Sequence, residues 1–299
     1  MQTAILGLGR MGAAIALRLA QAGHELSVWN RSPGATRELA NLGASVLEQP
    51  HEAFEHAELV ITMLADDDAV RAVVLGEQGV LAGAGAGSSG QPVLIDMSTI
   101  SPAASAQIAS ACAQRAVAYL RAPVSGNPSV VAAGNLGIIV SGPEPVFERV
   151  AGTLRDIGPN LFHVGEQEQA RVVKLALNLM VGGSTQLLAE ALVLGEQSGI
   201  STAKMLEVIN GSAIGSPYVK YKTAALVAED YSSTFTASLL HKDLTLALQA
   251  GHEASVPLPL TAATRQLVED CIASGMGEMD LAALVPRLRR EAGGPTAGG

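Results

Sequence analysis

Short runs rich in β-branched residues alternate with amphipathic helical stretches along the first half of the chain. The first units are a strand at 3–6, a helix at 11–22, a strand at 26–29 and a helix at 34–42. Because a helix connects each strand to the next, this rhythm predicts βαβ units and therefore a parallel sheet. Further apolar runs, enough to build a doubly wound sheet, follow at 59–64, 93–97, 117–124 and 137–141.

After about residue 165 the strand pattern stops. The stretch 167–197 repeats apolar residues at spacings of three and four, which predicts one long buried helix. Further helices are expected at 202–210, 239–253, 258–274 and 280–288. The fold class is thus α/β: a doubly wound sheet domain at 1–164, then an all-α domain at 165–291 that begins with the long interdomain helix. Residues 81–91 are expected to form a surface loop, and 292–299 a disordered tail.

Composition narrows the class of protein. The chain has 299 residues, 48% of them hydrophobic and 16% charged, and this length suffices for two domains. No apolar stretch approaches the roughly 18 to 20 uninterrupted residues of a membrane span, and the N-terminus lacks the segments of a secretory signal. A net charge of -9 argues against nucleic acid, whose phosphates require clustered Lys and Arg. We therefore expect a cytoplasmic protein that binds neither membrane nor nucleic acid.

The cysteines predict no special chemistry. Cys112 and Cys271 lie far apart and outside any CxxC or Cys/His spacing. Neither a disulfide framework nor a metal site is therefore expected, and both side chains are interpreted as small core hydrophobes.

A glycine-rich turn ends the first predicted strand and begins the first predicted helix. Its residues, in the pattern GxGxxG, are Gly7, Leu8, Gly9, Arg10, Met11 and Gly12. In this context the first glycine serves the tight turn, the second lets the backbone approach a pyrophosphate, and the third allows close packing of helix on strand. The N–H groups of the helix N-terminus then face the anion. The motif predicts a dinucleotide site, the alternative being an ordinary glycine turn.

The end of the second predicted strand indicates which dinucleotide is bound. NAD-specific sites usually carry Asp or Glu there, whereas this chain has Asn30, Arg31 and Ser32. Because an arginine can pair with a 2′-phosphate, we expect NADPH, with Asn30 and Ser32 as uncharged partners. The alternative is that Arg31 is a solvated loop residue. Leu64 and Ala65, after the fourth strand, are expected to contact the cofactor through their backbone.

Two more strand ends place hydroxyl groups at the predicted carboxyl edge of the sheet. Ser98 and Thr99 precede a helix, where the simplest interpretation is a helix cap. Ser125, Gly126 and Asn127 offer a hydroxyl and backbone amides suited to a carboxylate, although a simple turn explains this segment equally well.

Lys174 and Asn178 lie four residues apart on the long predicted helix and therefore share one face. A lysine in this apolar run either extends to solvent or occupies a polar cleft. In a cleft between domains, desolvation lowers the pKa of a lysine toward the range useful for acid/base catalysis. The residues themselves leave both interpretations open.

Taken in order, these motifs resemble the β-hydroxyacid dehydrogenase family, which includes 3-hydroxyisobutyrate dehydrogenases and tartronate or succinic semialdehyde reductases. The resemblance covers nearly the whole chain. It rests on five ordered segments, namely 7–12, 96–102, 122–126, Lys174 with Asn178, and Phe235 followed by 242–244.

The resemblance implies an NADP-binding Rossmann domain at 1–164 and a helical substrate and dimerisation domain at 165–291. It implies that Lys174 is the catalytic acid/base and that Asn178 supports the substrate. The segment with Ser125 and Gly126, with Asn127 beside it, would hold a substrate carboxylate. Thr99 and Lys242 would contact the cofactor.

This chain departs from the family pattern in places that bear on the substrate. Family members commonly have an acid before Ala-Pro-Val-Ser-Gly and a second glycine after it, whereas this chain has Arg121 and Asn127. Glu168 and Ala170 stand where the family often keeps glycines. The departures leave the expected chemistry in place and the identity of the substrate open.

The resulting hypothesis is a homodimer or higher assembly that transfers hydride between NADPH and a small β-hydroxy acid or semialdehyde. One alternative is an imine reductase, because those enzymes resemble this family but generally lack the lysine. A second alternative is a non-catalytic NADPH-binding sensor, in which Lys174 would be a buried ion-pair partner.

Overall fold

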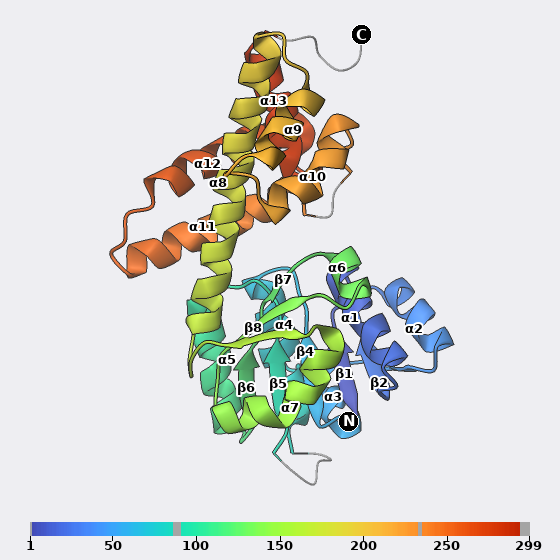
Figure 1. The fold of residues 1–299 in the computed structure, drawn as a ribbon. Coiled ribbons are helices and arrows are strands. Elements are labelled where there is room, and N and C mark those ends of the chain that lie inside the picture. The colour runs from blue at the N-terminus through green and yellow to red at the C-terminus, as the bar shows by residue number, and fades with distance from the viewer. Residues whose placement is uncertain (1, 86–90, 233–234, 294–299) are drawn as a thin grey trace. The chain divides into compact units, whose positions relative to one another are not determined.

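The structure is a computed structural model and describes residues 2–85, 91–232 and 235–293. The chain forms two compact units, divided between Lys174 and Leu175. The first unit is an α/β unit and the second is built from helices (Figure 1). The expected α/β class, a doubly wound sheet followed by an all-α part, is confirmed.

A six-stranded parallel sheet forms the centre of the first unit, with strand order β3-β2-β1-β4-β5-β6. Its strands are β1 (Thr3–Leu6), β2 (Leu26–Trp29), β3 (Ser45–Val46), β4 (Leu59–Thr62), β5 (Val93–Asp96) and β6 (Ala118–Arg121). The chain order reverses between β1 and β4, so the carboxyl ends of these strands flank the crevice in which open α/β sheets bind ligands.

Both faces of the sheet are covered by helices, as the near-continuous apolar strands require. Along β1, Ile5 packs into one core, and Ala4 and Leu6 pack into the core on the opposite face. The helices are α1 (Arg10–Gln21), α2 (Arg37–Asn41), α3 (Ala53–His56), α4 (Asp67–Leu75), α5 (Pro102–Gln114), α6 (Pro128–Ala132) and α7 (Glu144–Ile157). Short 3₁₀ helices occur at Pro33–Thr36 and Pro50–Glu52.

A small second sheet completes this unit, with order β7-β8-β9. Its strands are β7 (Val124–Ser125), β8 (Gly137–Val140) and β9 (Asn160–His163), with β7 antiparallel to β8. The single strand expected at 117–124 is therefore two strands, β6 and β7, which belong to different sheets. Pro123 lies between them and cannot donate to a ladder, which explains the break.

The long helix α8 (Gln169–Gln197) begins in the first unit and continues into the second. The second unit then contains α9 (Thr202–Gly211), α10 (Pro217–Val227), α11 (Ala237–Glu253), α12 (Pro259–Cys271), a π-helical turn at Ile272–Met276, a 3₁₀ turn at Leu281–Ala283 and α13 (Leu284–Glu291). Its core contains Leu192 of α8, Leu240 and Leu244 of α11, and Val268 of α12.

Helix α10 was not expected from the sequence. Its buried residues are Val219, Lys222 and Leu226, so a lysine stands where an apolar residue would mark the core-facing stripe. Lys222 Nζ donates to Asp280 Oδ1 at 2.6 Å, which makes this burial possible. The charge thus hides the apolar periodicity that would have predicted the helix.

The sequence predicts irregular structure at 81–91 and at 292–299. The expectation of a surface loop at 81–91 is wrong at its start, because Val80–Gly83 is a 3₁₀ helix in which Val80 and Leu81 are buried. Gly83 packs there so closely that a Cβ would lie 1.9 Å from the carbonyl oxygen of His51. Residues 86–90 lie outside the described residues, as do 294–299 of the expected tail.

By length and composition alone, α8 could cross a bilayer, with a mean hydropathy of 1.3 over its most apolar window. The core helix of a protein passes the same test, and 44% of that window is buried inside the protein. Asn178, Thr185 and Gln186 are buried polar residues on this helix, and each forms a hydrogen bond within the fold. These contacts are typical of a helix packed in a protein core.

Arg289 of α13 fastens the end of α8 within the second unit. Its Nε and Nη2 donate to the two carboxylate oxygens of Glu196 at 2.8 and 2.6 Å, and its Nη1 donates to Glu229 at 2.7 Å. The hydrogen bonds from Arg289 hold the pKa of Glu196 below its ordinary value. Both side chains of the main pair are half-buried, so solvent screens the interaction only in part.

Replacing Arg289 with Met keeps most of the side-chain bulk and removes these hydrogen bonds. At pH 7 we expect the free energy of unfolding to fall by about 2 kcal/mol, a typical value for hydrogen bonds to a charged group. A lowered carboxyl pKa stabilises the fold above the ordinary pKa of the group, and this contribution is lost as the pH falls through the lowered value. Calorimetric unfolding of wild type and Arg289→Met between pH 7 and about pH 3 checks both points. A difference between the two proteins that stays constant over this range would contradict the assignment.

Candidate functional site

The glycine turn between β1 and α1 has the geometry that its sequence predicts. Gly7 has a φ of +99°, and a Cβ there would lie 2.4 Å from the carbonyl oxygen of Met63. A Cβ on Gly12 would lie 1.9 Å from the carbonyl oxygen of Gly7, so α1 can approach the turn only with glycine at this position. Gly9, Arg10 and Met11 form the start of α1, where Gly9 is the N-cap residue.

Asn30 connects this turn to the end of β2. Its Oδ1 accepts from the backbone N–H of Leu8 at 2.9 Å, and its Nδ2 donates to the carbonyl of Ser32 at 3.0 Å. The side chain therefore shapes two loops at the carboxyl edge of the sheet. Arg31 and Ser32 are exposed beside it.

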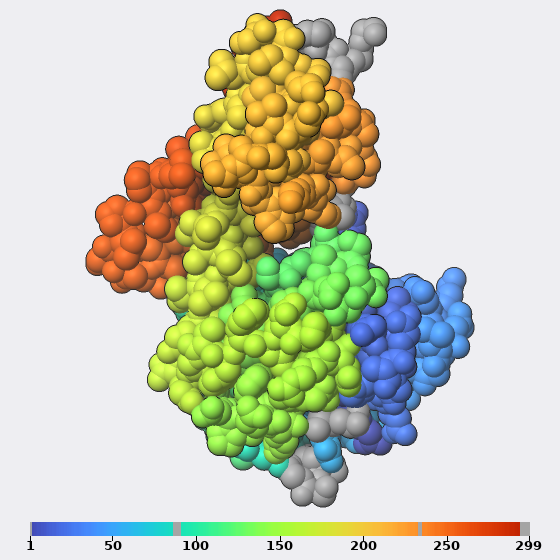
Figure 2. Space-filling view, in the orientation of Figure 1, coloured from blue at the N-terminus to red at the C-terminus, as the bar shows by residue number. Residues whose placement is uncertain are grey.

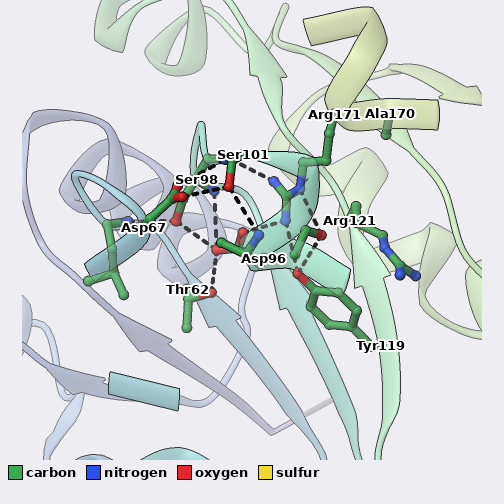
Figure 3. Close-up of polar contacts among 12 residues, drawn as sticks. Thr62, Asp67, Asp96, Ser98, Ser101, Tyr119, Arg121, Ala170 and Arg171 are labelled. Carbon is green, nitrogen blue, oxygen red and sulfur yellow. Dashed lines mark hydrogen bonds and ion pairs between the residues drawn. The ribbon is translucent and has the colours of Figure 1, made fainter. Parts of the chain in front are cut away.

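The loops after β4 and β5 are joined by hydrogen bonds around Asp96. Thr62 Oγ1 and Ser98 Oγ donate to Asp96 Oδ1 at 2.7 and 2.6 Å, and the backbone N–H of Leu64 donates to Ser98 Oγ at 2.9 Å (Figure 3). Ala65, in the first of these loops, is exposed, and Thr99, in the second, is half-buried. Both are thus held at the carboxyl edge of the sheet.

The interpretation of Ser98 and Thr99 as a helix cap is wrong for the helix that follows. The N-cap of α5 is Ser101, whose Oγ accepts from the backbone N–H of Ala104 at 3.0 Å. Ser101 Oγ also donates to Asp67 Oδ2 at 2.5 Å, which ties the start of α5 to the start of α4. Ser98 serves the Asp96 network instead.

Arg171 is a residue of this region that sequence reasoning missed. It lies in the first turn of α8, and its guanidinium contacts Asp96 and also bonds the carbonyl of Ser98 at 2.7 Å (Figure 3). Its side chain is 1% exposed. The available signal was a charged residue three positions before Lys174 at the start of an apolar helix.

The segment expected to hold a carboxylate lies at the end of β7. Ser125 and Gly126 are exposed, and Gly126 has a φ of +143°, which favours glycine. Asn127 is the N-cap of α6, and its Oδ1 accepts from the backbone N–H of Val130 at 3.0 Å and from Ser129 Oγ at 2.6 Å. The side-chain oxygen of Asn127 therefore caps the N-terminus of α6.

Two of the departures from the family pattern contact each other. Arg121 Nε and Nη2 both donate to Glu168 Oε1, at 2.9 and 2.5 Å. The guanidinium of Arg121 also lies 4.7 Å from the ring centre of Tyr119. The charge that Arg121 introduces is thus paired inside the protein with the carboxylate immediately before α8.

Lys174, the last residue of the first unit, is half-buried on α8. In the second unit Asn178, also on α8, donates through Nδ2 to Asp243 Oδ2 at 2.5 Å. Lys242 Nζ lies 3.1 Å from Asp243 Oδ1. The structure therefore brings Asn178 and Lys242 together through Asp243, a buried residue to which the sequence analysis gave no role.

No group of three or more His, Cys, Asp or Glu side chains suited to a metal ion occurs in the part of the chain that the structure describes. Cys112 and Cys271 are buried free cysteines. The polar groups at the carboxyl edge of the sheet instead suit an organic ligand, with a glycine turn at a helix N-terminus and several hydroxyls.

Family models match nearly the whole chain. The NAD binding domain of 6-phosphogluconate dehydrogenase matches residues 2–165, and the NAD-binding domain of NADP-dependent 3-hydroxyisobutyrate dehydrogenase matches residues 169–288. The chain is 34% identical to 2-(hydroxymethyl)glutarate dehydrogenase of Eubacterium barkeri, covering 98% of this chain and 97% of the relative. It is 35% identical to 3-hydroxyisobutyrate dehydrogenase of Pseudomonas aeruginosa, covering 88% and 90%.

Solved structures agree with these matches. The 3-hydroxyisobutyrate dehydrogenase of Mycobacterium tuberculosis, in a structure with L-serine, is 28% identical and has a TM-score of 0.85, covering 96% of this chain and 99% of that one. An imine reductase from Pseudomonas sp. is 25% identical with a TM-score of 0.63 at coverages of 96% and 99%. With a glycine turn in the expected geometry and matches over both units, the chain belongs to the 3-hydroxyisobutyrate dehydrogenase family of β-hydroxyacid dehydrogenases.

Proposed function

We propose that this protein is an NADPH-dependent oxidoreductase that interconverts a small β-hydroxy acid and its semialdehyde, with Lys174 as general acid/base. The supporting observation is the placement of Lys174 in the first unit, on a helix whose first turn is bonded to the loop that carries Thr99. Acid/base chemistry on a substrate oxygen requires such a group beside the cofactor site. The relatives named above act on carboxylate-bearing hydroxy compounds, which supports the substrate class.

In the reducing direction, a nicotinamide cofactor bound at the glycine turn would supply the hydride. The positive charge of protonated Lys174 stabilises the substrate oxygen as negative charge develops on it, and Lys174 then donates its proton to that oxygen and becomes neutral. Ser125 Oγ and the N–H of Gly126 bind the far carboxylate, assisted by Asn127, so that the carbonyl is oriented before the reaction. Asn178, fixed by Asp243, supports the substrate, and Lys242 contacts the cofactor.

The glycine at position 9 supports dinucleotide binding by the first unit, because nothing within the protein requires glycine there. A Cβ on Gly9 would meet no protein atom within 4 Å, and its φ of -66° is open to any residue. Neither packing nor backbone conformation therefore requires glycine here. A pyrophosphate that approaches the backbone at the N-terminus of α1 does require it.

Arg31 supports NADPH over NADH. Asn30 is uncharged, and its side-chain oxygen already accepts from the backbone N–H of Leu8, so this side chain presents no negative charge to a 2′-phosphate. Arg31 is exposed beside it, where a guanidinium pairs with phosphate bidentately.

Two observations favour a hydroxyacid substrate over an imine. The TM-score is 0.85 against the 3-hydroxyisobutyrate dehydrogenase and 0.63 against the imine reductase. Lys174 is also retained, and imine reductases generally lack this lysine. A cofactor-binding sensor without turnover is the remaining alternative, and the absence of any cofactor oxidation in the assays below would favour it.

We also propose that the protein acts in the cytoplasm as a homodimer or higher homo-oligomer. In the second unit, Met180, Leu187 and Leu194 recur every seven residues along α8 with exposures of 64%, 58% and 71%. An apolar row with this spacing is typical of a helix that packs against another helix, and a second copy of the chain offers the same row.

Matched alanine substitutions in the glycine turn test the cofactor site. Gly9→Ala should leave the melting temperature of the cofactor-free protein unchanged and weaken NADPH binding about tenfold or more, because the added Cβ obstructs only the ligand. Gly12→Ala should lower the melting temperature even without NADPH, because its Cβ clashes with Gly7. Titration calorimetry and thermal unfolding measure the two effects. Unchanged NADPH affinity in Gly9→Ala would place the dinucleotide elsewhere.

Arg31→Ala tests the choice of cofactor. Losing a charge-assisted contact to the 2′-phosphate removes about 1.5 to 3 kcal/mol, so kcat/KM with NADPH should fall about 10- to 150-fold. The value with NADH should change little, because NADH lacks that phosphate. Steady-state rates with each cofactor check this, and equal losses with both would assign Arg31 another role.

Lys174→Ala tests the chemistry. With glyoxylate and succinic semialdehyde as substrates, kcat should fall about 10²- to 10⁴-fold while NADPH affinity is retained. Oxidation of NADPH, followed by absorbance, measures the rate, and cyclic imines are assayed in parallel. Turnover of imines alone, or a variant with nearly full activity on the semialdehydes, would remove Lys174 from the mechanism.

A further inference from the structure

Arg171 occupies a place that helix stability does not explain. It lies in the first turn of α8, where the helix dipole disfavours a cation. Its side chain and that of Asp96 are 1% and 0% exposed, and removing such charges from water costs several kcal/mol each. Burial disfavours the charged guanidinium, yet the contacts with Tyr119 and Asp96 outweigh this and raise the pKa of Arg171. The arginine is therefore charged, and its contacts with Asp96 and Tyr119, not the stability of the helix, account for its place.

The guanidinium connects four segments of the first unit at once. Nη2 contacts Asp96 of β5 and donates to Tyr119 Oη of β6 at 3.0 Å. Nη1 donates to the carbonyl of Ser98 at 2.7 Å, and Nε donates to Ser105 Oγ of α5 at 3.2 Å. A planar guanidinium can satisfy these directions together, whereas the ammonium of a lysine cannot.

Through Ser98 the same network reaches the loops assigned to the cofactor. Ser98 Oγ accepts from Leu64 in the loop after β4, and Thr99 is the next residue along the chain. In the opposite direction, Lys174 follows Arg171 by three residues, less than one helical turn. One buried group thus joins both loops to the first turn of α8, just before Lys174, and Figure 3 shows Arg171 extending from that helix to Asp96.

We propose that Arg171 is a positioning residue of the site, which fixes the first turn of α8 on β5 and β6 and thereby sets the place of the Lys174 ammonium. The proposal rests on the proposed role of Lys174. Removing Arg171 alone leaves the buried Asp96 carboxylate without its counter-charge, so a loss of stability is expected in any case. The consequence specific to this proposal is geometric. A displacement of about 1 Å at a reacting group can reduce the rate about a hundredfold.

Neighbouring contacts act in the same direction. Ser141 Oγ accepts from the backbone N–H of Ala170 at 3.2 Å and donates to the carbonyl of Gln167 at 2.5 Å. Arg121 bonds Glu168, immediately before α8. These contacts hold the residues around the helix start, but Arg171 alone among them bonds to both Asp96 and the Ser98 carbonyl.

The first test reads the environment of Lys174 without activity. In the cofactor-free full-length protein, acetic anhydride acetylates lysines, and mass spectrometry gives the rate at each one. Arg171→Met keeps the bulk of the side chain, and we expect it to loosen the first turn and change the acetylation rate of Lys174 about threefold or more. Lys204, exposed on α9 in the second unit, is the internal control and should not change. An unchanged Lys174 rate in folded Arg171→Met would overturn the proposal.

The second test is a double-mutant cycle with glyoxylate or succinic semialdehyde. Arg171→Met should lower kcat about 10- to 100-fold with KM within about threefold of wild type. Combined with Lys174→Ala, the same change should have little further effect, because its target is gone. Arg289→Met, which breaks a comparable clamp at the other end of α8, should leave kcat unchanged. An equal loss from Arg171→Met with and without Lys174 would make Arg171 merely structural and overturn the proposal.

Arg171→Lys keeps the proposal testable if Arg171→Met fails to fold. This variant retains the charge opposite Asp96 but loses the fork, so it should fold and show an intermediate kcat and Lys174 acetylation rate. Full wild-type kcat in Arg171→Lys would overturn the requirement for the guanidinium. Lys174→Ala tests the role of Lys174 and acetylation tests only its environment, so failure of the proposed function is distinguishable from failure of this inference.

Discussion

The carboxylate of Asp96, buried at the end of β5, is the constraint on which the arrangement of the first unit depends. A charge so far from water is tolerated only when it is paired and hydrogen-bonded. Thr62 and Ser98 donate to one oxygen and Arg171 contacts the other. These contacts fix the relative positions of three segments, namely the ends of β4 and β5 and the start of α8. The loops at the ligand-binding edge of the sheet are fixed with them, because they continue directly from these strands.

The second unit uses the same kind of interaction twice. Asp243 of α11 accepts from Asn178, and Asp280 accepts from Lys222 of α10. Each contact joins two buried polar side chains within a largely apolar core. Apolar packing tolerates small shifts in helix register, whereas a buried hydrogen-bonded pair has one geometry, so these contacts specify how the helices align. Figure 2 shows the side chains on one face of the molecule, coloured along the chain.

Much of the fold could be predicted from the sequence, because its signals are local. The apolar runs in the sequence correspond to strands of the parallel sheet. A strand that is covered on both faces is apolar throughout and does not alternate with polar residues, so it is visible as a continuous apolar run. The turn at Gly7 and Gly12 was recognisable because no side chain fits in either place. Helix α10 escaped prediction because Lys222 occupies its core-facing stripe, and the two-residue strand β3 was too short to show a period.

By itself the sequence determined the alternation of strands and helices, the long α8, the glycine turn and the order of the site motifs. Hydrophobic periodicity, and the steric requirement for glycine at certain turns, each depend on a few neighbouring residues, so both can be recognised in the sequence. Only the tertiary structure decided that Arg171 meets Asp96 and that Arg121 meets Glu168, pairs separated by 75 and 47 residues. The sequence does not show which group a charged residue will pair with. That partner depends on which strand ends and helix starts lie next to each other in the folded protein.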